Sequence, residues 1–166
     1  MGIKFFDYDD VSDSDVIIKG KSFQILLDIC FKYSKEFSFS FDETNHKQFP
    51  TLDAYMIRKE LETPYHYESY PTTRKWIKFY RCCEKAKQAI LNITDDFWKL
   101  CGAPDLLNPE DLTFYRQDKS VFFCSRWHEG YGTFYPRRDE DVSAFFKAVD
   151  FHTEINTIQI VEDRYQ

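Results

Sequence analysis

The stretch CSRWHEGY, residues 124–131, holds a thiol, an imidazole and a carboxylate within six positions of one another. Cysteine-dependent enzymes use a thiol that a neighbouring base activates and a third group orients. The stretch therefore predicts a candidate catalytic site with Cys124 as nucleophile, His128 as base and Glu129 as the third group. Arg126 would contact an anionic substrate.

The geometry of a strand opposes this catalytic site. Residues 120–127 are rich in β-forming types, and a strand continued to His128 would separate it from Cys124 by about 13 Å, at roughly 3.3 Å per residue. A nucleophile and its base need contact at about 3 Å. The turn is expected at Glu129 and Gly130, too late to bring the imidazole back. We therefore expect a hairpin whose thiol is buried and has a raised pKa.

No metal or cofactor site is expected from the sequence. The four histidines are scattered, and the closest pairing of possible ligands is His66 with Glu68, which is too few for a metal site. A glycine-rich phosphate loop and a dinucleotide fingerprint are both missing, and five glycines leave little material for either.

An acidic run between residues 7 and 15 is the strongest candidate for binding a partner. Its carboxylates could mimic a polyanion and occupy a basic cleft, where desolvated charge pairs can dominate the affinity. The alternative is a solvated loop or strand edge without a partner. The residues of this acidic run are Asp7, Tyr8, Asp9, Asp10, Asp13 and Asp15.

Charge and composition favour a protein partner over a nucleic acid. The net charge is −6, and residues 84–166 contain 15 acids and 10 bases. Such a field repels a polyphosphate and attracts an electropositive protein. Aromatic residues make up 19% of the chain, which predicts an aromatic core, and the tyrosines and tryptophans suit a recognition surface.

The cysteines and the absence of a long apolar run predict a cytoplasmic protein. The five cysteines are odd in number and follow no disulfide framework, so we expect reduced thiols. The N-terminal residues do not resemble a signal peptide, and no window approaches the roughly 20 apolar residues of a membrane span.

The first half of the chain predicts alternating helices and strands. Apolar spacing predicts a helix over 23–35 capped by Ser22, and strict alternation of Phe and Ser predicts a strand over 37–41. A short helix is expected over 54–61, and a strand over 65–70 is the weaker expectation.

Residues 76–100 carry apolar residues at spacings of three and four, typical of one helix or of two helices with an N-cap at Asp95 and Asp96. On this interpretation Arg74, Lys78 and Arg81 face water. A strand over 76–82 remains the alternative.

The C-terminal half predicts a meander followed by a helix and a strand. One helical turn at 108–110 and strands over 112–116, 120–127 and 131–135 are expected, then a helix beginning near Asp139. A last strand near 155–161 is a further expectation. We therefore predict a single α+β domain spanning 1–166, in which helices pack on one face of an antiparallel sheet.

Three segments of the sequence resemble a known group of proteins: MGIKFFDYDDVSDSDVIIKG, FSFSF and NPEDLTFYRQDKSVFFCSRWHEGYGTFYPRRDEDVS. The group consists of small cytosolic proteins of Gram-positive bacteria, some of which carry the label stage III sporulation protein AH. The resemblance covers most of the chain and implies no catalytic residue.

The hypothesis that follows is an acidic cytosolic binding module that inhibits a basic protein partner, as immunity proteins and antitoxins do. Two alternatives come from other classes. One is a small enzyme that uses Cys124, His128 and Glu129, and the other is a regulatory subunit with an aromatic interface.

Overall fold

The computed structural model describes residues 1–6, 18–41, 49–62, 75–100, 110–126, 130–149 and 158–161. The strands in these ranges are β1 (Gly2–Phe6), β2 (Glu36–Phe41), β3 (Met56–Glu62), β4 (Lys75–Arg81), β5 (Glu110–Tyr115), β6 (Val121–Arg126), β7 (Tyr131–Phe134) and β8 (Ile158–Val161). The helices are α1 (Lys21–Tyr33), α2 (Pro50–Asp53), α3 (Glu84–Ile93), α4 (Phe97–Leu100) and α5 (Ser143–Ala148).

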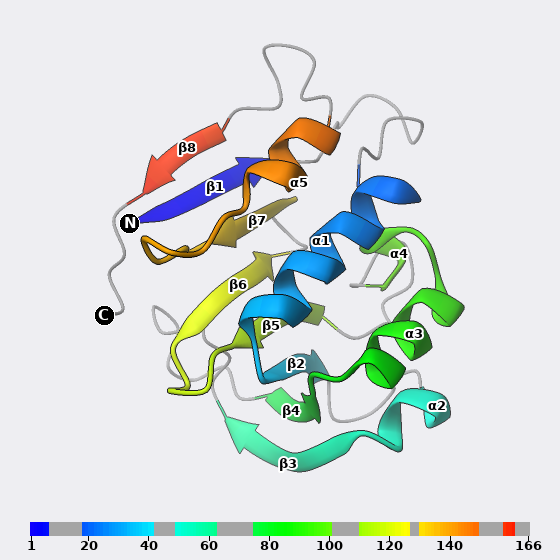
Figure 1. The fold of residues 1–166 in the computed structure, drawn as a ribbon. Coiled ribbons are helices and arrows are strands. Elements are labelled where there is room, and N and C mark those ends of the chain that lie inside the picture. Colours follow the sequence, from blue (N-terminus) through cyan, green and yellow to red (C-terminus); the bar gives the residue numbers. More distant parts are fainter. Residues whose placement is uncertain are drawn as a thin grey trace.

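All eight strands form one antiparallel sheet in the order β3-β4-β2-β5-β6-β7-β1-β8. The helices pack on one face, with α1 across the middle of the sheet, α5 on one side of it and α3 on the other (Figure 1). The predicted α+β class and the β5-β6-β7 meander are confirmed. The N-terminal strand β1 is an inner strand of this sheet, because it lies between β7 and the edge strand β8.

The layer between sheet and helices is an aromatic core, as the composition predicted. The three phenylalanines of β2 are at most 2% exposed, and the ring of Phe37 lies 5.5 Å from that of Phe31 on α1. Below α5, the Phe134 ring lies 4.9 Å from Phe123 and 5.4 Å from Phe145. Such tilted and edge contacts add to the stabilisation from buried apolar area.

The predicted helix over 23–35 is confirmed as α1, but its cap is not. Gly20 occupies the N-cap position and provides no side-chain cap. Ser22 lies in the first turn, where its hydroxyl donates to the Lys19 carbonyl at 3.0 Å. A serine two positions inside a helix bonds locally in this way, since its side chain reaches back to the preceding backbone.

The predicted helical seam over 76–100 is wrong in its first part, and the strand alternative is correct. Residues Lys75–Arg81 form β4, which pairs with β2 and β3. Lys78, expected to face water, is 5% exposed and its ammonium lies 3.2 Å from the Asp53 carboxylate. The second part of the seam is helical, and Asp96 caps α4 by accepting a bond from the Trp98 N–H at 3.0 Å.

The short helix predicted over 54–61 is also wrong. Helix α2 ends at Asp53, and Met56–Glu62 is strand β3, whose backbone pairs with β4 along its whole length. Tertiary pairing overrides the helical propensity of this segment. The strand over 65–70 and residues 108–109 of the expected helical turn lie outside the described residues. Glu110, the last residue of that turn, is instead the first residue of strand β5.

At the C-terminal end the expected elements are present with shifted limits. Helix α5 begins at Ser143 rather than near Asp139, since Glu140 is engaged elsewhere, in an ion pair with Arg116. Val142, Phe145 and Val149 are buried, and β8 pairs with β1.

Candidate functional site

Cys124 lies in β6 and is buried. Its neighbour Phe123 pairs with Phe114 and Phe134, which belong to the aromatic core, so Cys124 points to the sheet face opposite the helices. Burial raises the pKa of the Cys124 thiol well above its ordinary value, and a bond from Tyr135 offsets only part of the rise. The thiol is therefore protonated at neutral pH. His128 and Glu129 lie outside the described residues.

Two cations lie beside this thiol, and both contact Tyr131. The Arg126 guanidinium donates to the Tyr131 hydroxyl at 3.2 Å, and the Lys4 ammonium lies 3.5 Å from the centre of the Tyr131 ring. Their charges lower the pKa of Cys124, but by less than burial raises it. Arg126, expected to contact an anionic substrate, is thus held by a neighbouring strand.

We expect the Cys124 thiol of the folded protein to react with iodoacetamide at pH 7 at least roughly tenfold more slowly than a model thiol, because only the thiolate is nucleophilic. Mass spectrometry of the Cys124 peptide measures the rate. The same peptide in denaturant is the control and should label at the rate of a free thiol. Labelling of folded Cys124 as fast as the model thiol would restore the enzyme hypothesis.

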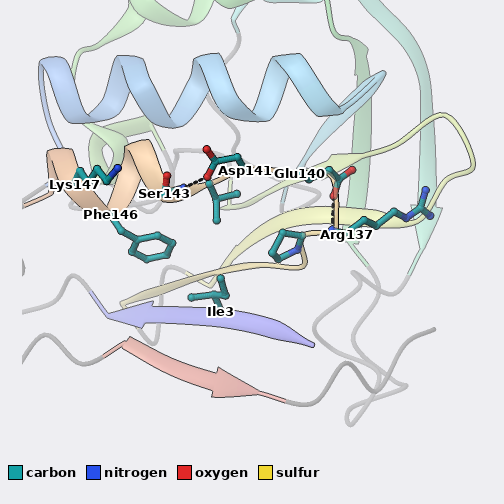
Figure 2. A pocket seen from close by; sticks show the side chains of 9 residues that line it. Ile3, Arg137, Glu140, Asp141, Ser143, Phe146 and Lys147 are labelled. Atoms are coloured by element: carbon teal, nitrogen blue, oxygen red, sulfur yellow. Dashed lines mark hydrogen bonds between the residues drawn. The ribbon is translucent and has the colours of Figure 1, made fainter.

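A groove of about 450 Å³ lies between α5 and β1, on the helix-covered side of the sheet. Its walls include Ile3 from β1, Pro136 and Val142 from the segment before α5, and Phe146 and Lys147 from α5. Figure 2 shows Ile3 and Phe146 facing the same space from opposite sides. The size is within the range of small-ligand sites, and an open apolar groove equally fits a side chain of a protein partner.

The segment that forms one wall of this groove is held in place by hydrogen bonds. The Asp141 carboxylate accepts from the Ser143 N–H at 2.8 Å, and the Asp141 N–H donates to the Tyr33 hydroxyl of α1 at 3.1 Å. Bonds from the backbone and the hydroxyl of Ser143 lower the pKa of Asp141. Glu140 is fixed by Arg116. The groove is therefore formed before any partner arrives.

The acidic run lies outside the described residues, but both of its flanks are fixed. It follows β1, and it precedes Ile18, which is fully buried and accepts a hydrogen bond from the Phe97 N–H at 3.1 Å. Two positions on, the Gly20 N–H donates to the Asp95 carbonyl at 2.7 Å. The aspartates are thus tethered at each end to the folded framework.

The excess of acids lies entirely outside the described framework. The described residues include 19 bases and 14 acids, a net charge of +5. The remaining segments include 3 bases and 14 acids, a net charge of −11. The acidic character noted in the sequence therefore belongs to the segments that connect the strands and helices, above all to the acidic run.

Within the part of the chain that the structure describes, no three His, Cys, Asp or Glu side chains gather in a way that could hold a metal ion. None of the described helices has the length and apolarity needed to cross a membrane. Comparison with protein-family models, with curated proteins and with solved structures finds no match to this chain.

Sequence reasoning missed the groove. Ile3 and Phe146 come from opposite ends of the chain and meet only because β1 pairs with β7 beneath α5. A local signal was the presence of two apolar residues, Val142 and Phe146, in the segment of the predicted C-terminal helix.

Proposed function

We propose that this chain is an acidic binding module that recognises and inhibits a basic protein partner, in the manner of immunity proteins and antitoxins. The observation that carries the proposal is the position of β1. This strand supplies Ile3 to the groove and leads directly into the acidic run at Asp7. One short strand therefore connects the apolar groove to the start of the acidic run along the chain.

The acidic run and the apolar groove would contribute to binding in different ways. Opposite charges steer a basic partner toward the module and speed the encounter, whereas an apolar pocket that takes an anchoring side chain supplies affinity. The protonated state of the Cys124 thiol favours binding over the alternative of thiol chemistry. The described cysteines are free thiols, which is compatible with our proposal of a cytoplasmic location.

Replacing the five aspartates of the acidic run with asparagine should weaken binding roughly tenfold or more, because each lost carboxylate removes a charge pair with the basic partner. The tagged protein and its variant are used to capture partners from a lysate of the source cells, washed at low and high salt. We expect one stoichiometric basic protein, released by salt and retained poorly by the variant. Inhibition is then measured on the activity of that protein.

A matched control removes five acids from the described framework and changes the net charge equally. It should retain the partner nearly as well as the unmodified protein does. If both variants lose partner binding equally, net charge alone explains the effect. If neither variant loses partner binding, the charge-mimic mechanism is wrong. The control positions are Asp28, Glu84, Asp95, Asp118 and Asp139.

A further inference from the structure

The two edges of the sheet are built differently. Edge strand β3 has charged residues at Arg58, Lys59 and Glu60, which is how natural sheets discourage pairing with other chains. Edge strand β8, with the sequence IQIV, has no charged residue. Among the described residues no strand pairs with the outer edge of β8, which makes this edge a candidate for an added strand.

An exposed side chain joins this edge to the groove. Ile160 of β8 is 64% exposed, and its Cα partner in β1 is Ile3, which lines the groove. Opposite residues of an antiparallel pair point to the same face of a sheet. The apolar wall formed by Ile3 and Phe146 therefore continues through Ile160 to the edge. A four-residue strand offers few backbone hydrogen bonds, so the groove must supply part of the affinity of anything that docks here.

The charges in the sequence around β8 indicate which strand would fit. Residues 155–161 are uncharged, Glu154 precedes them, and Glu162 and Asp163 follow. A second copy of this chain would bring the same acids on both sides of its own β8. Like charges oppose such pairing, whereas lysine or arginine on both sides of an apolar segment complements it.

We infer that the β8 edge docks an extended segment of a basic partner, which adds a ninth strand to the sheet and places an aliphatic side chain in the groove beside Ile160. Backbone bonds to β8 provide the pairing, and bases on either side of the segment provide the charge match. This inference rests on the proposed function and names the part of the partner that is recognised.

A synthetic peptide, Lys-Lys-Thr-Ile-Thr-Ile-Thr-Lys-Lys, tests the inference without a purified partner. We expect the peptide to bind the protein, as measured by fluorescence anisotropy. We also expect it to shift the backbone amide NMR resonances of residues 158–161. A peptide with Glu in place of every Lys should not bind. A peptide with Pro in place of its central Thr should bind at least fivefold more weakly, because proline lacks the N–H that a strand donates.

The protein variant Ile160→Thr keeps the β-branched shape but removes apolar surface, and should weaken peptide binding at least fivefold. Ile57→Thr, at a 43% exposed position of β3, is the matched control and should bind like the unmodified protein. If the proline peptide binds as tightly as the peptide with threonine at its centre, charge alone explains the interaction and the inference is wrong. Absence of binding would overturn it as well.

Light scattering of the protein without peptide measures its oligomeric state. We expect the protein to be a monomer. If it is a dimer and Ile160→Thr dissociates that dimer, the β8 edge binds a second copy of the chain and the inference is wrong. The two proposals fail separately. If the asparagine variant loses the captured partner while Ile160→Thr retains it, the function stands and the docking edge is wrong. If a partner is captured and neither charge nor salt affects it, the charge-mimic function is wrong.

Discussion

Replacing Arg116 with methionine should lower the free energy of unfolding by roughly 3–5 kcal/mol, as is typical when one member of a buried ion pair is removed. Arg116 is 6% exposed, and the side chain of its partner Glu140 is 8% exposed. Methionine fills most of the volume but leaves the Glu140 carboxylate buried without its cation. Most of the loss comes from that stranded charge.

The guanidinium of Arg116 also connects three parts of the chain. Its Nε and Nη2 donate to the two Glu140 carboxylate oxygens at 2.7 and 2.5 Å. Further bonds reach the carbonyls of Val121 and Tyr135 at 2.7 and 2.5 Å, and the Ser120 hydroxyl at 3.2 Å. The β5-β6 turn and the segment that walls the groove are thereby fixed to one another, so the variant should also loosen the groove.

Urea denaturation measures this loss, and two further variants interpret it. Arg137→Ala removes an exposed pair with Asp118 and should cost much less stability than Arg116→Met. The double variant Arg116→Met with Glu140→Leu should recover much of the stability, because no buried charge remains. A single-variant loss as small as that of Arg137→Ala would show that Glu140 regains water when Arg116 is removed.

The same ion pair predicts a dependence on pH. Burial alone would raise the pKa of Glu140, but bonds from Arg116 and from the Arg137 N–H outweigh it, so the pKa lies below its ordinary value of 4.5. A carboxyl whose pKa is lowered by folding stabilises the protein above that ordinary value and ceases to do so as the pH falls through the folded value. In Arg116→Met the effect of burial on Glu140 is no longer offset by the guanidinium, so its carboxyl takes up a proton at higher pH. The difference in stability between the unmodified protein and the variant should therefore begin to shrink above pH 4.5 and continue to shrink as the pH falls below 4.5.

The elements that local patterns predicted are those with one face in the core. Helix α1 shows the apolar spacing of a half-buried helix. Strand β2 alternates Phe toward the helices with Ser on its other face, and Ser38 and Ser40 are buried there as well. Strand β4 lacks the alternation of apolar and polar residues that marks a strand with one buried face. Its residues Phe79 and Tyr80 point to opposite faces of the sheet and are 5% and 0% exposed. With apolar residues on both faces, the spacing of Trp76, Phe79 and Cys83 matched a helix by coincidence.

Only the part of the candidate site that lies within one short segment of the chain could be predicted from the sequence. The acidic run is visible in the sequence, since its charge lies within nine consecutive residues. The ion pair of Glu140 could not be predicted, because its partner Arg116 is distant in sequence and their contact depends on the β5-β6 turn. The groove requires β1 to lie beneath α5, a long-range arrangement that no local pattern encodes.

That arrangement of β1 leads to the second large effect: Gly132→Val should lower the free energy of unfolding by about 3 kcal/mol, the upper range for overpacked cores. Gly132 in β7 lies opposite Phe5 of β1. A Cβ at this position would lie 2.5 Å from the Phe5 Cζ and 3.0 Å from the Phe123 Cε2. Both rings are fully buried, and Phe5 also packs 5.0 Å from Phe145, so it has little room to withdraw.

A double-mutant cycle with Phe5→Leu separates this clash from other causes. Valine is favourable in strands, so backbone propensity should not contribute to the loss. If the ring of Phe5 is the obstacle, Gly132→Val should cost at least about 1 kcal/mol less when residue 5 is leucine, an interaction energy typical of residues in contact. Additive losses would place the strain elsewhere in β7. A loss relieved by leucine would establish that the missing side chain of Gly132 sets how closely β1 approaches β7, and therefore where Ile3 and the β8 edge lie.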